Sequence, residues 1–394
     1  MTVAYTVERF PVLSQTFVRN EVAELTRQGV DVVVARLHEG DDVAVGVPVV
    51  EVRAPHDGRL ALLLDHLHFA TRRPHGYLRF LLAVRALPVE RRQIAWRRLP
   101  RVARTLRRHG VDRLHAHFAW GGAALALALS ELTGWPWAMT MHARDIFTER
   151  RNLTPKLSRA DLLITVCDYN LDYLRAHLGV RRPIAKVVCG VEVPASVSDL
   201  SDRPIAVCFV GRMVAKKGVD LLIEAFARIA GDRPDAQLHL VGEGPLLDPM
   251  KELASQLGVS GQTRFHGALP HEETLRVIER SRVLCLPARV APDGDVDSMP
   301  LVVKEAMARS TAVVAAAAGG VGEMVDGNSG LLVTPNDVAA LADALTLLLD
   351  DDERRRKVAL CGRDKVEREF TLRGEVEKLR ALLADMGSNS SMRG

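Results

Sequence analysis

Short apolar runs alternate with amphipathic segments along the first half of the chain. VAYTV, VDVVVARL and VDRLHAHF are typical of buried strands, whereas QTFVRNEVAELTRQG carries its apolar residues on one helical face and ends at a glycine. The segments GGAALALALSELTG, WAMTMHARDIF and ADLLITVCDYNLDYLRAHLG continue the alternation. Strands and helices in this order predict a parallel sheet covered by helices.

The second half repeats the scheme with cleaner strand runs. These are PIAVCFVGR, AQLHLVGEG, RVLCLPA, TAVVAAA and GLLV, each followed by a helical pattern or a glycine-rich turn. The chain is therefore predicted to be an α/β protein with two Rossmann-like, doubly wound parallel-sheet domains that face a central cleft. In such sheets, ligands bind at the carboxyl ends of the strands.

The segment between the halves sets the predicted boundaries. VEVPASVSDLSDRP contains proline, serine and aspartate and little that could be buried, which is typical of a linker. We predict a first, acceptor-binding domain over 1–191, the linker over 192–204, a second, nucleotide-binding domain over 205–365, a C-terminal helix over 366–386 that could pack back on the first domain, and a flexible tail over 387–394.

The composition is that of a soluble globular protein, with 394 residues, 47% of them hydrophobic and 26% charged. The five cysteines are scattered and never spaced as CxxC, which indicates neither a disulfide framework nor a zinc site and favours a reducing cytoplasm. MTVAYTVERF carries charge where a secretory signal is apolar, and no apolar run has the length of a membrane span. Any membrane contact is therefore expected to be peripheral.

The stretch DGDVDSMPLVVKEAMA, at 293–308, combines three aspartates with a proline-started helix. Ser298 suits the N-cap of this helix, and Pro300 suits its first turn. The N–H groups of Leu301 and Val302 are then free to bind a phosphate.

Further groups indicate the same kind of ligand. Glu305 lies one turn into the same helix, where a carboxylate can bind two hydroxyls of a ribose. Arg212 and Lys217 follow the strand IAVCFV, where a guanidinium and an ammonium group can neutralise a diphosphate. Gly242 and Gly244 form a turn that lets the backbone approach a ligand closely. Taken singly, a surface ion pair or an ordinary turn explains each of these motifs.

Together and in this order, the motifs resemble glycosyltransferase family 4 of the GT-B fold, over nearly the whole chain. The family's GRxxxxKG, VGxGP and FxGxL motifs stand at Gly211–Gly218, Val241–Pro245 and Phe265–Leu269. Its E-x7-E element, which runs into EAMA, stands at 297–308, and GGVGEMVDGNSGLLV is similar to the family's GGxxExxxxGxxGLLV. The resemblance implies a retaining transferase that uses a nucleotide sugar, with a UDP-sugar as the first expected donor and a GDP-sugar as the second.

The resemblance also implies roles for single residues. Arg212 and Lys217 would hold the diphosphate, Glu305 the ribose, and the backbone near His266 and Gly267 the base. Further donor contacts are expected from Thr16, Gly211, Gly242, Gly244, Ser298, Met299, Pro300, Leu301 and Val302.

One position departs from the family's pattern. The first glutamate of the E-x7-E element is Asp297 here, and the glycine that usually follows it is Ser298. The shorter acid and the added side chain change the space around the hydroxyls of the donor sugar, so the identity of the donor stays open. Asp297 is nonetheless expected to be catalytic, together with His142, Arg212 and Lys217.

The aspartates of this stretch also offer an alternative. Asp293, Asp295 and Asp297 stand at every second position, and a hard cation such as magnesium or manganese binds carboxylates spaced in this way. The neighbouring lysine and arginine already supply positive charge, so we expect no metal and no other cofactor. An acidic solvated loop around one functional aspartate explains the same residues.

In the first domain, FPVLSQTFVRNE follows the first strand, where many family members carry a glycine-rich phosphate loop. Ser14, Gln15 and Thr16 stand there instead, which resembles the branch acting in colanic-acid and exopolysaccharide assembly. Thr16 would then contact the donor, and Ser14 and Gln15 the acceptor, through hydroxyl and N–H groups at a helix start. An ordinary helix cap before Phe17 explains these residues equally well.

Histidines occur in LHAHF and MHARDIF, two segments that also resemble sequences of this family. By resemblance, His142 contacts the donor sugar near its anomeric carbon. His117, Arg144 and Asp145 are candidates for contact with the acceptor, whereas His115 is expected in the core or at the surface.

The expected chemistry is same-face displacement. No carboxylate pair marks a reaction centre, so a double displacement lacks an evident nucleophile. An acceptor hydroxyl would attack while the departing diphosphate, held by Arg212, Lys217 and the helix N-terminus, takes up its proton. A nucleotide-sugar epimerase of the same fold and a binding module without catalysis stay open as alternatives.

The segment 72–109 is dense in arginine and has Glu90 as its only acid. Leucine, isoleucine and Trp96 alternate with arginine at helical spacing, which suits peripheral contact with an anionic membrane or a phosphorylated lipid acceptor. A solvated basic face and a nucleic-acid surface are alternatives, although no nucleic-acid-binding module is recognisable and no such partner is expected. The acceptor is a glycan, a lipid-linked glycan or a small natural product.

Overall fold

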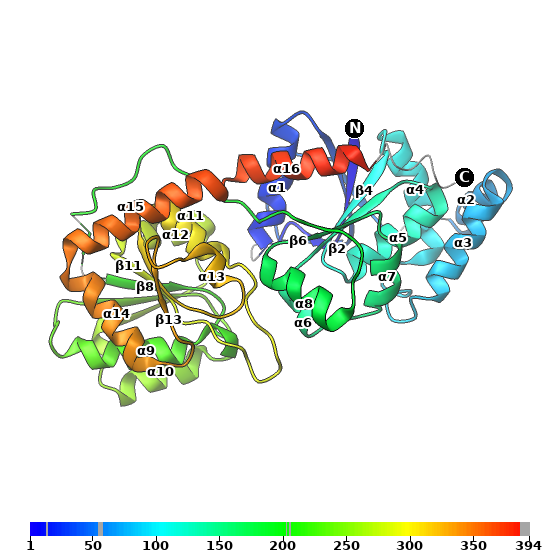
Figure 1. Ribbon diagram of the computed structural model, residues 1–394. Coiled ribbons are helices and arrows are strands. Elements are labelled where there is room, and N and C mark those ends of the chain that lie inside the picture. Colours follow the sequence, from blue (N-terminus) through cyan, green and yellow to red (C-terminus); the bar gives the residue numbers. More distant parts are fainter. Residues whose placement is uncertain (13–14, 54–57, 202, 205, 387–394) are drawn as a thin grey trace. The chain divides into compact units, whose positions relative to one another are not determined.

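The computed structural model of the chain describes residues 1–12, 15–53, 58–201, 203–204 and 206–386 (Figure 1). The chain divides into two compact units. The first unit contains Met1–Val166, Asn170–Val187 and the chain from Glu375 onward, and the second contains Cys167–Tyr169 and Val188–Gly374. The predicted tail over 387–394 lies outside the described residues.

The first unit contains a seven-stranded parallel sheet with the strand order β3-β2-β1-β4-β5-β6-β7. Its strands are β1 (Thr2–Phe10), β2 (Asp31–Glu39), β3 (Val49–Glu51), β4 (Arg113–His117), β5 (Trp137–Met141), β6 (Leu162–Thr165) and β7 (Ile184–Lys186). The strands β1, β2 and β4 to β6 were predicted from apolar runs. β3 and β7 have only three residues each, too few to give a pattern in the sequence.

Helices connect these strands because parallel neighbours require a crossover. They are α1 (Thr16–Arg27), α2 (Arg59–Arg72), α3 (Pro74–Arg85), η2 (Trp96–Arg98), α4 (Leu99–Arg108), α5 (Gly121–Thr133), α6 (Ala143–Phe147), α7 (Leu153–Arg159) and α8 (Asp168–Leu178). The central helix α5 is buried along almost its whole length, and its small residues allow close packing on β1 and β4.

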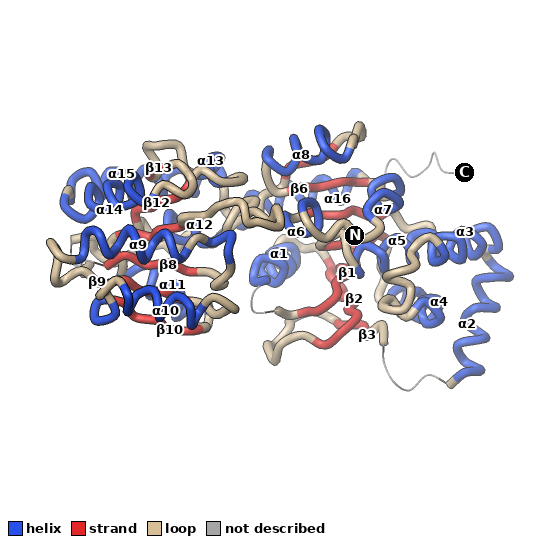
Figure 2. The backbone as a smooth tube through the Cα atoms, turned by 90° about the horizontal axis from the view of Figure 1, so that it is seen from below, coloured by secondary structure: helices blue, strands red, loops and turns tan. Residues whose placement is uncertain are grey.

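The second unit contains a six-stranded sheet with the order β10-β9-β8-β11-β12-β13, and all of its pairings are parallel. Its strands are β8 (Ala206–Val210), β9 (Gln237–Val241), β10 (Thr263–Gly267), β11 (Val283–Leu286), β12 (Ala312–Ala316) and β13 (Leu331–Val333). This order is that of a doubly wound sheet whose direction reverses beside its first strand. In Figure 2 the strands of each sheet lie between helices.

The helices of this unit are η3 (Ala215–Lys217), α9 (Val219–Ala230), α10 (Leu247–Gln256), η4 (Ser260–Gln262), α11 (His271–Arg280), α12 (Leu301–Ala308), α13 (Val321–Met324), α14 (Val338–Asp350) and α15 (Asp352–Glu369). The predicted α/β architecture of two doubly wound parallel sheets is thus confirmed. Because the strands of each sheet are parallel, all their carboxyl ends, and the loops that follow them, lie at one edge of that sheet.

The segment predicted as one helix over 366–386 contains the end of α15 and a separate helix, α16 (Leu372–Asp385). The later turns of α16 belong to the first unit, where the guanidinium of Arg113 donates to the carbonyl oxygen of Leu383. Arg380 of α16 donates to the carbonyl of Gln28 at 3.3 Å. Among the described residues, no helix is long and apolar enough to span a membrane.

Candidate functional site

Glycines join the carboxyl ends of three neighbouring strands in the second unit. The N–H of Gly211, after β8, donates to the carbonyl of Val241 at 3.0 Å, and the N–H of Gly242, after β9, donates to the carbonyl of Gly267 at 2.8 Å. Gly242 has φ +132°, and a Cβ atom there would lie 1.9 Å from the carbonyl oxygen of Gly211. Only glycine allows this backbone to approach its neighbour so closely.

The next turn is closed in the same way. Gly244 has φ +154°, and a Cβ atom there would lie 2.6 Å from the carbonyl oxygen of Met213. The N–H of Met213 donates to the carbonyl of Glu243 at 2.9 Å, and the N–H of Leu246 donates to the carbonyl of Met213 at 3.1 Å. The loops after β8 and β9 therefore form one hydrogen-bonded edge, and Arg212 stands between Gly211 and Met213 in the first of these loops.

Two lysines of the β8 loop bind two aspartates that follow β11. Nζ of Lys217 lies 2.6 Å from Oδ2 of Asp297, and Nζ of Lys216 lies 3.0 Å from Oδ1 of Asp295 and 3.3 Å from Oδ1 of Asp297. Burial raises the pKa of Asp297, but the charges of Lys217 and Lys216 outweigh this effect and hold it below the ordinary value. Asp297 is therefore an ionised carboxylate with cationic partners.

These ion pairs bear on the magnesium alternative. Asp295 and Asp297 are bound to lysines, and the carboxylate of Asp293 accepts the N–H of Asp295 at 3.0 Å. Ammonium groups therefore neutralise Asp295 and Asp297. The oxygens of a phosphate-bearing ligand can replace the carboxylates as partners of the lysines.

Arg212 is an exposed cation beside this cluster. Within the described part of the chain, no carboxylate lies within ion-pair distance of its guanidinium. Its charge is therefore available to an anionic ligand at the same strand end as Lys216 and Lys217.

The prediction that Ser298 caps the next helix is wrong. α12 begins at Leu301, and its N-cap is Pro300, with φ −64° and ψ 125°. Proline fits this position because its fixed φ is compatible with the extended N-cap and it has no N–H to leave unpaired. The N–H groups of Leu301 and Val302 are still the first two of the helix and need no intrahelical acceptor, as the prediction required.

The segment before α12 rests on a pair of glycines after β12. A Cβ atom at Gly319 would lie 1.9 Å from the carbonyl oxygen of Asp297, and one at Gly320 would lie 2.1 Å from that of Ser298. Both Asp297 and Ser298 are buried. The predicted GGxxE motif thus has a clear physical function, which is to support the chain that carries Asp297.

Glu305 and His266 have histidine partners. Oε1 of Glu305, on α12, lies 2.9 Å from Nε2 of His271, and the Glu305 side chain is mostly buried. Nε2 of His266 lies 2.9 Å from Nδ1 of His239, and burial together with the charge of Arg264 lowers the pKa of His266. The carboxylate placed inside an apolar run is thus paired, which is what a half-buried charge requires.

In the first unit, His142 ends a hydrogen-bonded chain of side chains from three other elements. The hydroxyl of Tyr5 donates to Oε1 of Glu21 at 2.5 Å, and Nε2 of His117 lies 2.8 Å from the same oxygen. Nδ1 of His117 lies 3.1 Å from Nε2 of His142. Tyr5 comes from β1, Glu21 from α1 and His117 from β4, so the fold and not the local sequence assembles this chain.

Burial and neighbouring charges shift the pKa values of Glu21 and His142 in this hydrogen-bonded chain of side chains. Burial raises the pKa of Glu21, but the charge and hydrogen bond of His117, with His115 and the Tyr5 hydroxyl, lower it to about 2. Burial, the charge of His117 and that of His115 hold the pKa of His142 well below its usual range. At neutral pH, His142 is a neutral imidazole at the end of a chain anchored by a carboxylate.

His115 lies in the same cluster and is fully buried, which is the first of the two positions predicted for it, core or surface. Its Nε2 atom lies 2.8 Å from Oγ1 of Thr140, whereas its Nδ1 atom has no hydrogen-bond partner. Burial lowers its pKa to about 3. Ligand atoms of Glu21, His115 and His117 lie within 4.8 Å of one another, so these side chains could hold a metal ion.

Aromatic rings surround His142. Its ring centroid lies 4.6 Å from that of Phe118 and 5.0 Å from that of Phe17, and the Phe118 ring stacks on Trp120 at 5.3 Å. Phe118 has φ 65°, which a bulky side chain rarely adopts. The turn after β4 therefore holds a strained aromatic residue against the imidazole.

Phe17 also brings the start of α1 to this cluster. Gln15 is the N-cap of α1, but its side chain makes no capping hydrogen bond, and Thr16 is the first helical residue. An ordinary side-chain cap therefore does not explain Gln15 or Thr16. Ser14, the remaining member of the predicted loop, lies outside the described residues.

Asp145 and His117, which were predicted to contact the acceptor, are both buried. Asp145 is fully buried, and its two side-chain oxygens accept the N–H groups of Ala119 at 2.5 Å and His142 at 2.8 Å. His117 is buried between its two partners. Both residues support His142 from inside the protein, and neither presents a group to an acceptor in this arrangement.

Arg144 remains at the surface. Its guanidinium pairs with Glu149 and lies 6.0 Å from the centre of the Trp120 ring. Its half-exposed side chain is therefore the one acceptor candidate of the MHARDIF motif with a solvent-accessible group.

Sequence comparison decides the family. The family model for glycosyl transferases group 1 matches residues 195–364, and the model for glycosyltransferase family 4 matches residues 14–193. Together they span both units. The chain belongs to glycosyltransferase family 4. The predicted resemblance is thus confirmed for both halves of the chain.

Two relatives of this family 4 chain are informative. It is 27% identical, over 97% of its length and 99% of the relative's, to WcaL of Escherichia coli, a glycosyltransferase named for colanic acid biosynthesis. It is 31% identical to a GDP-mannose-dependent monoacylated alpha-(1-6)-phosphatidylinositol monomannoside mannosyltransferase of Corynebacterium glutamicum. That second match spans 59% of this chain and 65% of the relative.

Solved structures share the fold. Anabaena HepE in complex with UDP and glucose is 18% identical and superposes with a TM-score of 0.72, covering 98% of this chain and 99% of that protein. The family 4 chain therefore has the GT-B fold.

Glu21 and Tyr5 were not predicted as site residues. One signal was present in the sequence, because Glu21 falls on the apolar face of α1 defined by Val18, Val22 and Leu25. A carboxylate on an apolar helical face is costly to bury without a partner, so its position indicates a bound group. Tyr5 lies inside an apolar strand and gives no signal of its own.

Proposed function

We propose that this family 4 protein transfers a sugar from a nucleoside diphosphate donor to an acceptor hydroxyl with retention at the anomeric carbon. The observation that supports the proposal best is the pairing of Lys217 and Lys216 with Asp297 beside the exposed Arg212. A diphosphate can replace the carboxylate as partner of these cations. Asp297 would then be released toward the sugar hydroxyls.

The start of α12 supplies further donors. N–H groups at a helix N-terminus bind phosphate oxygens, and those of Leu301 and Val302 are the first in this helix. Glu305 would exchange His271 for the ribose hydroxyls, and the backbone at His266 and Gly267 would contact the base. These assignments complete a nucleotide site from the carboxyl edge of one sheet.

The proposed reaction is a same-face displacement. The bond between the anomeric carbon and the diphosphate oxygen breaks, and its electron pair leaves with the diphosphate. The acceptor oxygen bonds to the anomeric carbon on the same face and gives its proton to the departing diphosphate. Arg212, Lys217 and the α12 N–H groups stabilise the leaving anion, which lowers the barrier. His142, as a neutral imidazole, would hydrogen-bond a hydroxyl of the donor sugar.

For the donor, we propose a UDP-sugar and name a GDP-sugar as the competitor. The relative from Corynebacterium is GDP-mannose-dependent by name, and the fold neighbour HepE holds UDP and glucose. Isothermal calorimetry with UDP, GDP, ADP and TDP would rank the bases. Absence of binding to any of them at millimolar concentration would overturn the nucleotide site.

We also propose that no metal takes part, since the lysines already neutralise the aspartates. Among the described residues, the group of Glu21, His115 and His117 could hold a metal ion if this is wrong. Metal analysis of the purified protein, with turnover before and after dialysis against a chelator, tests this. Stoichiometric zinc, together with lost turnover on chelation, would contradict the proposal.

The acceptor is proposed to be a glycan or a lipid-linked glycan reached from the cytoplasm, with peripheral membrane contact through 72–109; a small natural product is the alternative. WcaL is named for colanic acid biosynthesis, and the name of the Corynebacterium enzyme contains a phosphatidylinositol monomannoside. Acceptor-dependent release of nucleoside diphosphate tests transfer. Isomerised donor without release would indicate an epimerase, and tight binding without turnover would indicate a binding module.

A further inference from the structure

Helix α2 presents its apolar side chains to solvent. Leu60, Leu63, Leu64 and Leu67 have exposed fractions of 70%, 63%, 53% and 54%. Their spacing, i, i+3, i+4 and i+7, places them in one stripe along the helix. We call these four residues the leucine stripe. In a helix that serves only the protein core, such a stripe faces inward.

The inward face of α2 carries the buried Phe69 and polar side chains that are held by ion pairs and hydrogen bonds. Asp65, which is buried, pairs with Arg101 at 2.8 Å and with Arg104, both on α4. His66 lies 2.9 Å from the hydroxyl of Tyr77 on α3, and its other ring nitrogen lies 2.8 Å from the carbonyl of Arg97. These contacts fix the rotation of α2, so the leucine stripe stays outward. α2 and α3 lie together at the edge of the first unit (Figure 1).

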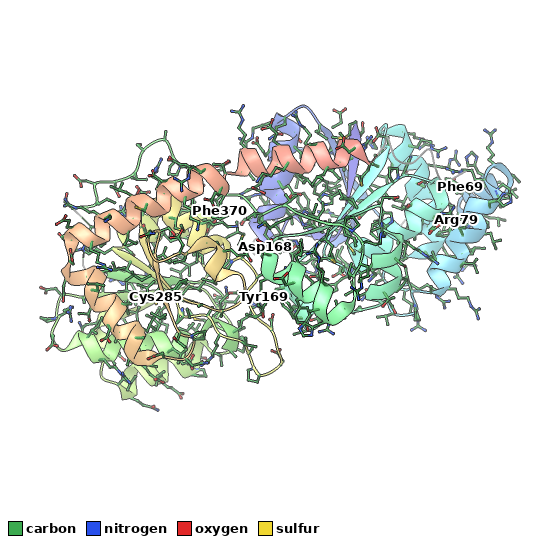
Figure 3. All side chains as sticks on the ribbon, in the orientation of Figure 1. Phe69, Arg79, Asp168, Tyr169, Cys285 and Phe370 are labelled. Carbon is green, nitrogen blue, oxygen red and sulfur yellow. The ribbon has the colours of Figure 1, made fainter. Side chains whose placement is uncertain are left out.

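An arginine-lined recess lies between the end of α2 and α4. Its volume is about 310 Å³, and it is lined by His68, Phe69, Arg72, Arg73, Arg104, Arg107 and Arg108, which we call the arginine recess. Figure 3 marks the place of Phe69 on α2. The lining contains no carboxylate. Within the described residues, no acid pairs with Arg72, Arg107 or Arg108.

Among the described residues, Arg104 is the one cation of the recess with an acidic partner, Asp65, which it shares with Arg101. Burial and the charges of Arg104, Arg72 and Arg107 lower the pKa of His68. Glu90, the only acid of the basic segment, is fully buried and bound to Nζ of Lys156 at 2.6 Å, so it does not neutralise the surface. The recess therefore carries a net positive charge suited to a phosphate group.

The leucine stripe and the arginine recess are adjacent on one helix. His68 lies one turn beyond Leu64, and Arg72 lies one turn beyond His68, so the recess begins at the flank of the stripe. An apolar stripe flanked by cations is complementary to a bilayer surface, where acyl chains lie beneath anionic phosphates. A protein partner would have to match both features, and a nucleic acid would leave the leucines exposed.

We propose that the leucine stripe inserts into the surface of an anionic phospholipid bilayer and that the arginine recess binds a lipid headgroup phosphate. The proposed membrane-binding surface therefore includes residues of α2 that precede Arg72, where the basic segment 72–109 begins. Its role in reaching a lipid-linked acceptor rests on the proposed function, whereas the binding itself does not.

Vesicle flotation with the full chain tests the proposal. Vesicles of phosphatidylcholine alone are compared with vesicles containing equal parts of phosphatidylcholine and phosphatidylglycerol. Wild-type protein should float with the anionic vesicles, and the triple variant Leu63→Gln, Leu64→Gln, Leu67→Gln should lose at least about tenfold in partition. Arg107→Glu with Arg108→Glu should also lose at least about tenfold, and only on anionic vesicles.

Matched controls come from the second unit. Leu360→Gln removes a leucine with 53% exposure from α15, and Arg368→Glu reverses a cation with 69% side-chain exposure there. Neither should change flotation. Thermal unfolding and calorimetry with UDP and GDP, without vesicles, show whether each variant is folded and still binds nucleotide.

Three results would overturn the inference. They are flotation of the leucine variant at the wild-type level, equal flotation of wild type with neutral and anionic vesicles, and a leucine variant that changes only from dimer to monomer in light scattering. The third result would make a second copy of the chain the occupant of the stripe. Absence of nucleotide binding with intact flotation would instead count against the proposed function alone.

Discussion

His117 joins Glu21 to His142, with its Nε2 atom 2.8 Å from Oε1 of Glu21 and its Nδ1 atom 3.1 Å from Nε2 of His142. Burial raises the pKa of Glu21, but its partners lower it to about 2, so this carboxylate only accepts hydrogen bonds. In neutral His117 the proton therefore lies on Nε2, and the Nδ1 atom accepts the N–H of His142. A carboxylate on α1 thus sets the tautomer of a ring that follows β5.

Replacing Glu21 by glutamine should disturb this tautomer without changing the shape of the cluster. An amide can donate as well as accept, so the protons of His117 and His142 are no longer fixed. We expect kcat to fall by at least about tenfold, by analogy with other carboxylate–imidazole pairs. The Kd for nucleoside diphosphate should stay unchanged, because its proposed contacts lie in the second unit. Steady-state kinetics and calorimetry measure the two quantities.

Glu24→Gln is the matched control for that variant. Glu24 is also a buried acid on α1, but it binds Gln28 and Arg27 and not the histidines. Its replacement should leave kcat near the wild-type value. Equal losses in both variants would mean that Glu21 acts only through the stability of α1.

Lys217 and Lys216 should contribute unequally to turnover. Lys217 approaches Asp297 to 2.6 Å, whereas Lys216 divides its contacts between Asp295 and Asp297. We expect Lys217→Ala to lower kcat by about 100-fold or more, because it removes charge from the leaving diphosphate. Lys216→Ala should have a smaller effect. Lys251→Ala, at an exposed lysine of the same unit, is the control, and near-normal turnover of Lys217→Ala would remove its proposed role.

Gly242→Ala should unfold or severely distort the second unit. The new Cβ atom would lie 1.9 Å from the carbonyl oxygen of Gly211, and φ +132° is unfavourable for alanine. A loss of about 3 kcal/mol or more in the free energy of unfolding is expected. Urea denaturation measures it.

Gly258→Ala separates the two causes of that loss. Gly258 also has a positive φ, +71°, but no atom lies within 4 Å of a Cβ atom built there. Only the backbone cost of about 1 to 2 kcal/mol should remain. A similar loss for both variants would show that contact with Gly211 is unimportant.

The sequence predicted those parts of the site that depend on local patterns. The strands β8 and β9 and the glycine turns after them follow from apolar runs and from glycine spacing, so Gly211, Gly242 and Gly244 could be found without a structure. The pairing of Lys217 with Asp297 could not, because 80 residues separate them. The sequence predicted the group that each would bind, but not that they bind each other.

Other features could not be predicted, because the pattern of apolar and polar residues gave no signal for them or a misleading one. β10, TRFHG, is only half-buried at a sheet edge and has no apolar run. α2 has an amphipathic pattern, but four of its leucines face solvent, and periodicity does not tell which face meets the core. The chain from Tyr5 to His142 joins four elements distant in sequence, which only the fold brings together.

The Asp145 carboxyl should make the stability of the first unit depend on pH. Burial raises its pKa to about 7, although the N–H groups of Ala119 and His142 oppose this. An unfolded aspartate has a pKa of about 3.9, so between about pH 4 and pH 7 the native state holds a proton that the unfolded state has lost. Stability contributed by this group is therefore lost as the pH rises through that window. Urea denaturation should show a larger drop from about pH 5 to about pH 8 for wild type than for Asp145→Asn, whose amide does not titrate. Equal drops would mean that the two backbone N–H groups keep Asp145 ionised throughout.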